Sequence, residues 1–194
     1  CPNLDISKYS LAELYNLEKT NKLALKKLKS ISSSSFFFLP SNLKKMSIIK
    51  SSNKKDEYKN LLFNNFKIWP KNKYILYKLA SYYKSKKQYH KSIKIYMKII
   101  NIYGESDQDL FLYASNLDKI GKWKQAKTLL LNLLKRNPKE IYTLNYVSYK
   151  LALKEQDLNL ALRLIKQALA IDPENGYFLD TLGWVEFKRK NYNK

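Results

Sequence analysis

Residue types that build catalytic and metal sites are scarce in this chain. Its 194 residues include one cysteine, one histidine and four scattered glycines. These numbers exclude a disulfide within the chain, a cysteine–histidine pair and a histidine metal cluster. Glycines this far apart also exclude a glycine-rich phosphate loop. We therefore expect no catalytic residues, no metal site and no cofactor.

The paired carboxylates do not change this expectation. Asp107 and Asp109 precede an apolar helical pattern, where acidic side chains cap free amides and offset the helix dipole. Asp172 and Glu174 flank Pro173 in a predicted turn. Both pairs are interpreted as structural.

Glycine and proline are also too few to interrupt the chain often. With 4 Gly, 5 Pro and 45% hydrophobic residues, the sequence predicts long helices around an extended core. Its aromatic cluster Phe36–Phe38 falls far short of the roughly 18 consecutive apolar residues that a membrane-spanning helix needs. The composition therefore indicates an all-α protein.

Small residues recur at a fixed step of 34 or 35 positions, or twice 34, which is typical of a helical repeat array. The first column of small residues is Ala12, Ala80, Ala114, Ser148 and Gly183. The second column is Ala24, Ser92, Ala126 and Ala161, and a turn column is Pro70, Gly104, Pro138 and Pro173. Small side chains let two helices approach closely, so each unit is predicted to be a pair of helices.

Within the unit, a small residue is flanked by Leu and Tyr, a glycine precedes an aromatic residue, an alanine follows, and a proline closes the unit. This pattern resembles the tetratricopeptide repeat (TPR), most closely at 110–138 and 144–173. The segment 144–187 is similar to the C-terminal repeats of long bacterial proteins of this superfamily. The resemblance implies an all-α, right-handed α-solenoid of antiparallel helix pairs, the TPR superhelix.

The repeat register predicts units at 5–38, 39–72, 73–106, 107–140 and 141–175, and an incomplete unit at 176–194. The first two, 5–72, are degenerate, and the units of 73–194 are regular. Asn42, Lys45 and Tyr58 depart from the pattern, so we expect a shifted or irregular first helix in the second unit. The Ser- and Phe-rich stretch 30–40 predicts a loop with a short buried aromatic plug. Unit five has one extra residue near 154–158, which we place in its inter-helix turn.

In TPR arrays the first helices of successive units line a concave groove that binds a peptide or helix. The resemblance places twelve residues of this chain on that groove: Tyr74, Tyr77, Ser81, Gln108, Phe111, Ser115, Tyr142, Asn145, Tyr149, Tyr177, Asp180 and Trp184. Large aromatic side chains with a polar end suit a protein-binding surface. The alternative is that several of these rings pack between repeats.

The formal net charge of +21 admits two interpretations. It fits a lysine-rich convex face that binds RNA or another anionic surface. It also fits compositional background, because Lys, Asn, Ile, Tyr and Phe are abundant while Arg is scarce, as an AT-rich genome would produce. The three arginines, Arg136, Arg163 and Arg189, are not clustered.

The two ends of the sequence carry further expectations. Cys1 fits either a fragment boundary or the lipid-modified first residue of a processed bacterial lipoprotein, so the compartment stays open between cytoplasm and cell envelope. The last unit stops before its second helix, which predicts an excerpt of a longer repeat protein. Leu179 and Leu182 would then lack a covering helix, so we expect self-association through this last repeat.

Together these observations predict a non-enzymatic protein-interaction scaffold that binds a peptide or helix in the concave groove, with no transmembrane segment. Two alternatives remain: RNA or anionic-surface binding through the lysine-rich face, and a lipid-anchored cell-envelope assembly factor.

Overall fold

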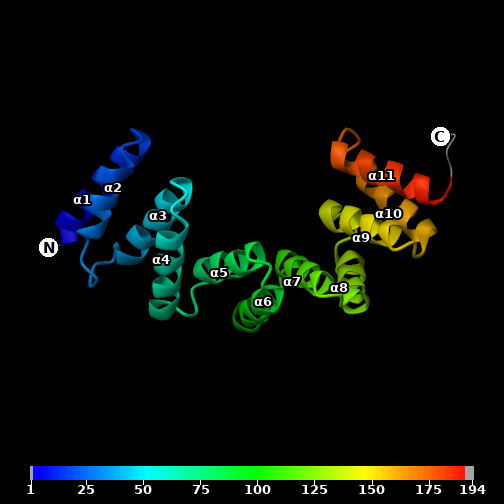
Figure 1. Ribbon diagram of the computed structural model, residues 1–194, viewed down its shortest axis with the longest axis horizontal. Helices are drawn as coiled ribbons and strands as arrows, with labels where there is room; N and C mark the ends of the chain where they lie inside the picture. The colour runs from blue at the N-terminus through cyan, green and yellow to red at the C-terminus, as the bar shows by residue number, and fades with distance from the viewer. Residues whose placement is uncertain (1, 191–194) are drawn as a thin grey trace. The chain divides into compact units, whose positions relative to one another are not determined.

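The computed structural model describes residues 2–190, which are helical apart from their turns and loops (Figure 1). The chain divides into an N-terminal unit, Cys1–Leu79, and a C-terminal unit, Ala80–Lys194. The N-terminal unit contains α1 (Pro2–Leu17), α2 (Asn21–Lys29), α3 (Phe38–Ser51), α4 (Lys55–Ile68) and the first half of α5 (Lys73–Ser85). The C-terminal unit contains the rest of α5, α6 (Tyr89–Tyr103), α7 (Asp107–Lys119), α8 (Trp123–Arg136), α9 (Ile141–Leu153), α10 (Leu158–Ile171) and α11 (Gly176–Lys188).

Small residues form the contact between the two helices of a pair, as the sequence predicts. Ala114 and Ala126 are completely buried on α7 and α8. Where serine replaces alanine, its hydroxyl binds a carbonyl of the partner helix. Ser92 Oγ donates to the Ala80 carbonyl at 3.0 Å, and Ser148 Oγ donates to the Ala161 carbonyl at 2.8 Å. The buried hydroxyl is thus satisfied, and the helix backbones remain close.

Gly183 is the exception in the first column of small residues. It is exposed, and a Cβ atom built on it would meet no atom within 4 Å. Its interpretation as a helix-packing residue is wrong for the described residues, because none of their helices covers this side of α11. Gly183 therefore lies on a side of α11 against which no other described helix packs.

The turn after each first helix contains a residue in the left-handed conformation. Lys19, Asn53, Lys87, Gly121 and Glu155 have φ values of 59, 56, 56, 81 and 51°. In each turn the following amide bonds a carbonyl five residues back, as Lys122 N does to Leu117 O at 3.0 Å. This is the Schellman arrangement that ends a helix. The chain therefore closes these helices in one way, although only Gly121 and Asn53 are of the residue types that this conformation favours.

The extra residue of unit five lies in the turn between α9 and α10, as predicted. This turn has four residues, 154–157, whereas the turns after α5 and α7 have three. Asp157 adopts a left-handed conformation with φ 39° and accepts a hydrogen bond from the Leu160 amide at 3.1 Å. The insertion therefore also supplies the N-cap of α10.

Each unit has its own apolar core. In the N-terminal unit, the core joins side chains of α1 to α3, including Ala12, Leu28 and Ile48. In the C-terminal unit, α9 and α10 pack together and α11 contacts both. The fully buried residues of this core include Leu130, Leu144, Val147, Ile165 and Phe178.

The structure corrects the expected irregularity of the second unit. α3 is a continuous helix, because its non-matching residues are accommodated locally. Asn42 is buried, and its amide donates to the Phe38 carbonyl at 2.8 Å. Lys45 is half-buried, with its ammonium group 6.0 Å from the centre of the Phe38 ring. Tyr58 on α4 packs against the core of the N-terminal unit.

The structure also corrects the predicted aromatic plug. The loop ends earlier than expected, because Phe38–Pro40 already belong to α3. Phe37 packs against the N-terminal core, with its ring 5.5 Å from that of Tyr9. Phe36 is 89% exposed, so its prediction as a buried residue is wrong. The core accepts one of these rings rather than all three.

Candidate partner-binding surface

Among the predicted groove residues of the C-terminal unit, three tyrosines are the most exposed aromatic side chains. Tyr142 on α9 is 64% exposed, Tyr149 on α9 is 41% exposed, and Tyr177 on α11 is 80% exposed. Tyr142 and Tyr149 are seven residues apart, so they lie on one face of α9. α11 contacts α9, which makes this exposed tyrosine set a feature of one packed unit.

α7 contributes less surface than the sequence suggests. Phe111 is half-buried and meets the Tyr146 ring edge to face, with 5.4 Å between centroids. Ser115 is buried, and its hydroxyl donates to the Leu112 carbonyl at 2.9 Å. Gln108 is exposed. Phe111 and Ser115 thus take part mainly in packing, which is the alternative that the sequence left open.

Two further predicted residues are half-buried. Asn145 Oδ1 and Trp184 Nε1 are buried atoms for which the described part of the chain supplies no hydrogen-bond partner. The Trp184 ring stacks on Phe187 at 5.5 Å, and the Lys188 ammonium group lies 5.2 Å from its centre. Asp180, one turn before Trp184, is exposed. The middle of α11 therefore presents the Asp180 carboxylate one turn from the half-buried Trp184 indole.

A polar network around the buried Asp118 carboxylate joins α7 to α9, the helix that carries Tyr142 and Tyr149. Asp118 Oδ2 accepts a hydrogen bond from Tyr146 Oη at 3.0 Å and pairs with Lys150 Nζ at 2.7 Å. Burial, together with the nearby Asp118 carboxylate, raises the pKa of Tyr146 well above its ordinary value. The phenol consequently stays protonated and keeps donating. Sequence reasoning missed these residues because they do not follow the column of small residues.

The remaining predicted residues lie on α5. Tyr74 is 42% exposed, and the Lys78 ammonium group lies 4.7 Å from its ring centre. Tyr77 is half-buried, with Lys73 Nζ 5.9 Å from its ring centre. Both tyrosines belong to the N-terminal unit. Ser81 is exposed and belongs to the C-terminal unit.

Solved structures of repeat proteins share this arrangement of helices. A tetratricopeptide repeat protein from Parabacteroides merdae aligns with a TM-score of 0.82 and 12% identity, over 97% of this chain and 74% of its own. PilW, described as a type IV pilus biogenesis factor, aligns at 0.75 and 14% identity, over 99% and 89%. YrrB, described as a TPR protein with an unusual peptide-binding site, aligns at 0.59 and 16% identity, over 79% and 78%.

This chain has a TPR fold. It is an all-α solenoid of helix pairs, as the spacing of its small residues predicts. No family model and no curated protein matches the sequence. At identities of this size, the likeness establishes the fold of the TPR array and nothing about its partners.

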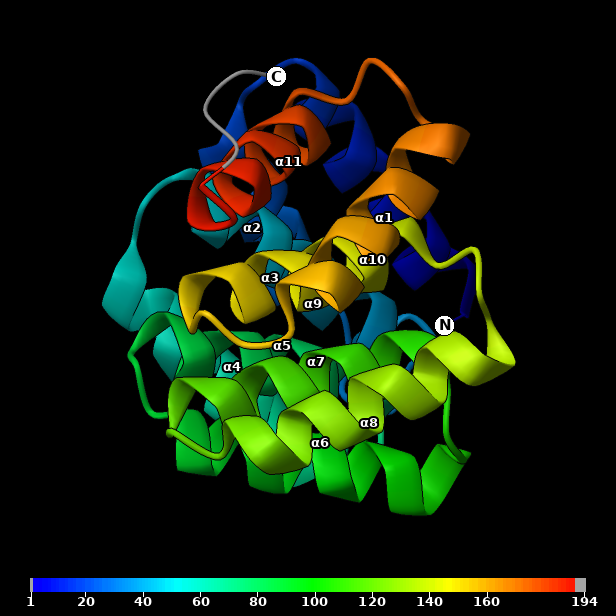
Figure 2. The same cartoon turned by 90° about the vertical axis from the view of Figure 1, so that its right-hand side faces the viewer.

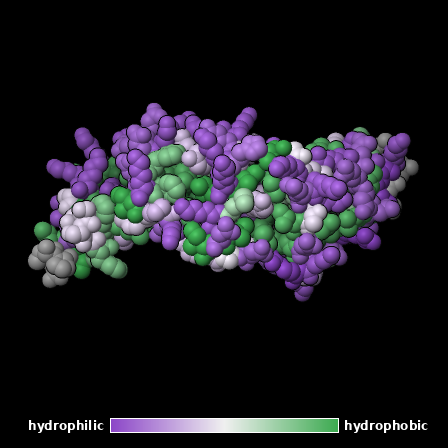
Figure 3. Space-filling view, turned by 90° about the horizontal axis from the view of Figure 1, so that it is seen from below, coloured by the Kyte–Doolittle hydropathy of each residue, from purple (hydrophilic) through white to green (hydrophobic). Residues whose placement is uncertain are grey.

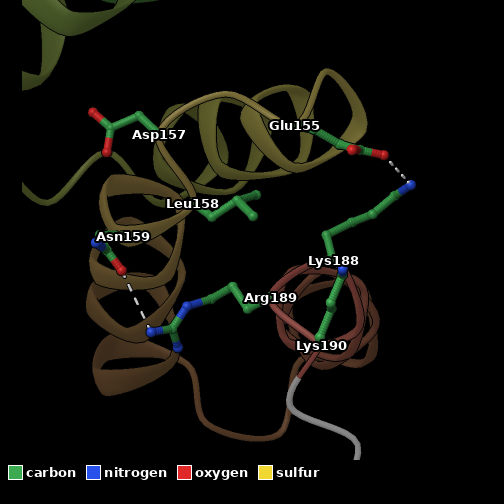
Figure 4. A pocket seen from close by; sticks show the side chains of 7 residues that line it. All are labelled: Glu155, Asp157, Leu158, Asn159, Lys188, Arg189 and Lys190. Carbon is green, nitrogen blue, oxygen red and sulfur yellow. Dashed lines mark hydrogen bonds and ion pairs between the residues drawn. The ribbon is translucent and has the colours of Figure 1, made fainter.

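The TPR array contains a shallow pocket beside the α9–α10 turn and the end of α11 (Figure 4). Two of its basic side chains have partners within the lining: Lys188 Nζ lies 2.6 Å from Glu155 Oε1, and an Arg189 Nη atom donates to Asn159 Oδ1 at 3.4 Å. The Lys188 ammonium group lowers the pKa of the Glu155 carboxyl. Because Glu155 neutralises Lys188, the pocket offers an anionic ligand less positive charge than its lysines suggest.

Within residues 2–190, the TPR array has no group of three or more His, Cys, Asp or Glu side chains placed to hold a metal ion. None of the helices in that range is long and apolar enough to cross a membrane. His90 is an exposed residue near the start of α6. Cys1, the residue on which the lipoprotein alternative depends, lies outside the described residues.

Proposed function

We propose that this TPR array is a non-enzymatic protein-interaction scaffold that binds a peptide or helix through the aromatic surface of its C-terminal unit. The observation that carries the proposal is the exposure of Tyr142, Tyr149 and Tyr177 on two packed helices. Tyrosine offers a large contact area and a hydroxyl while losing little rotamer freedom on binding. Exposed rings on adjoining helices therefore suit a partner that buries apolar side chains and accepts hydrogen bonds.

The rigidity of the supporting helices also favours binding. Tyr146, Asp118 and Lys150 connect α7 to α9, so the backbone carrying Tyr142 and Tyr149 is held by packing and by polar contacts. A surface ordered before binding loses less conformational entropy when a partner arrives. The peptide-binding site described for YrrB is a precedent for this role in a similar fold.

A displayed library of random peptides, selected on the purified chain, tests the proposal. Enriched peptides are synthesised, and their affinity is measured by fluorescence anisotropy at high salt, which suppresses binding through net charge. Replacing Tyr142, Tyr149 and Tyr177 together by alanine is expected to weaken binding at least about tenfold, since interface aromatics often contribute more than 1 kcal/mol each.

The matched control is Met97→Ala, Ile102→Ala and Ile171→Ala, which removes exposed apolar area from second helices. Both triple variants should keep the helicity of the unmodified chain. The proposal is wrong if no peptide is enriched, or if the tyrosine variant binds the enriched peptides as tightly as the control.

A further inference from the structure

Charges are sorted by helix within the C-terminal unit. α6 contains three lysines, α8 contains three lysines and one arginine, and neither helix contains an aspartate or a glutamate. α7, which lies between them in sequence, contains Asp107, Asp109 and Asp118. The first helices α5 and α9 also contain no acidic residue, so composition alone can leave a helix without one. The basic charge of α6 and α8 therefore bears on function only where it gathers with other features on an exposed surface.

Both basic helices pack against α7, and Figure 2 draws both of them below it. The helical period brings Lys124, Lys127 and Lys135 to one face of α8. Lys94 is exposed on α6. We call Lys94, Lys124, Lys127 and Lys135 the lysine face.

These four ammonium groups are not neutralised by neighbouring acids. Within the described residues, no ion pair involves Lys94, Lys124, Lys127 or Lys135, although Lys127 is half-buried. Arg136 differs, because it lies 2.9 Å from Asp107 and 3.3 Å from Glu105. The lysine face consequently retains positive charge that an anionic partner could neutralise.

Exposed apolar side chains accompany this charge. On α6, Met97 is 46% exposed and Ile102 is 38% exposed, and both lie on the same side of the helix as Lys94. Figure 3, which views the molecule from below Figure 1, shows hydrophobic side chains beside hydrophilic ones on one surface. Lysine next to unbranched or aliphatic side chains is typical of surfaces that bind anionic membranes. Recognition of single-stranded RNA would favour aromatic rings and arginine instead.

We propose that the lysine face of α6 and α8 binds an anionic phospholipid surface. Phosphate and carboxylate headgroups neutralise the four lysines, while Met97 and Ile102 contact the boundary between headgroups and acyl chains. This surface involves neither Tyr142, Tyr149 nor Tyr177, so lipid binding and peptide binding can be separated experimentally.

Vesicle flotation tests the proposal with the full chain. One set of vesicles is phosphatidylcholine alone, and a second contains roughly one-third phosphatidylserine, the kind of anionic lipid that attracts basic segments. We expect flotation with the second set only, and a decrease as salt rises. Changing Lys94, Lys124, Lys127 and Lys135 to glutamine should lower vesicle affinity at least about tenfold. Met97→Ser with Ile102→Ser should lower it further, without changing its salt dependence.

The matched control changes four exposed lysines of the N-terminal unit, Lys22, Lys26, Lys55 and Lys59, to glutamine. It has the same net charge as the lysine-face variant and should retain most of the vesicle affinity. Equal losses in the two variants would attribute binding to net charge and overturn the proposal. So would equal flotation with both vesicle sets. A lysine-face variant that loses affinity for a labelled single-stranded RNA but still floats with anionic vesicles would assign the surface to RNA and also overturn it.

Discussion

Tyr146 Oη lies 3.0 Å from Asp118 Oδ2, and this hydrogen bond joins α9 to α7 inside the C-terminal unit. Lys150 pairs with the same carboxylate oxygen at 2.7 Å, so one buried atom accepts from both groups. The side chain of Asp118 is 3% exposed, which removes most of the solvent that would otherwise screen the pair. The network holds α9, which carries Tyr142 and Tyr149, against α7.

Removing parts of this network should therefore have unequal costs. Tyr146→Phe deletes one donor while the carboxylate keeps Lys150, so we expect a loss of about 1 kcal/mol in the free energy of unfolding. Asp118→Leu leaves the half-buried Lys150 ammonium group and the Tyr146 hydroxyl without their shared partner, and should cost more, about 2–3 kcal/mol. Urea unfolding followed by circular dichroism measures both. Tyr142→Phe, at an exposed ring, is the control, and a change of similar size there would contradict the assignment.

The left-handed turn residues predict a stabilising substitution. Lys87 is exposed and has φ 56°, a conformation that side chains with a Cβ disfavour. Lys87→Gly should raise the free energy of unfolding by about 0.5–1 kcal/mol, the relief of strain being larger than the entropy that glycine adds to the unfolded chain. Thermal unfolding measures the gain. Lys86→Gly, one residue earlier, should bring no gain, and Gly121→Ala should destabilise.

At Gly183, unlike at Lys87, alanine should be more stabilising than glycine. It lies inside α11 without a positive φ, and a Cβ there would meet open space. Gly183→Ala is expected to stabilise the chain by about 0.5–1 kcal/mol, because alanine has a higher helix propensity. Chemical denaturation provides the measurement. If the alanine variant is destabilised, the side of α11 at Gly183 is in contact with another segment or another molecule.

Lys45 gives a prediction about pH. Burial, with a smaller contribution from Lys29, lowers the pKa of its ammonium group in the folded chain. Between this lowered pKa and the ordinary value of 10.5, the unfolded chain binds more protons than the folded one, so this group favours folding as pH rises. Lys45→Met removes the cost of burying the charge. Its stability advantage should be largest near neutral pH and should shrink as pH rises toward 10.5, which urea titrations at several pH values would show. An advantage independent of pH would mean that packing alone causes it.

The sequence predicts much of this fold because the same packing requirement recurs in each repeat. Ala80 and Ser92, or Ser148 and Ala161, must be small because two helices touch there, and that requirement recurs every 34 or 35 residues. Exposure is less predictable, since it depends on which neighbour covers a face. Ser115 and Tyr142 occupy different positions of the same predicted stripe, yet one is buried and the other is exposed. The binding role of the stripe itself stays a prediction.

The exposed side of α11 predicts self-association. Leu179 is 49% exposed, Phe187 is 51% exposed, and Gly183 lies between them at helical spacing. A helix that presents two large apolar side chains around a glycine can approach another helix closely, so we expect dimers or larger species as concentration rises. Light scattering coupled to size-exclusion chromatography measures the mass over a concentration series.

Leu179→Gln with Phe187→Gln should shift the chain toward monomer. The control, Leu17→Gln with Leu23→Gln at exposed positions of α1 and α2, should leave the mass unchanged. A single monomer peak at every concentration would refute the prediction, and equal effects of both variants would mean that association is not specific to α11.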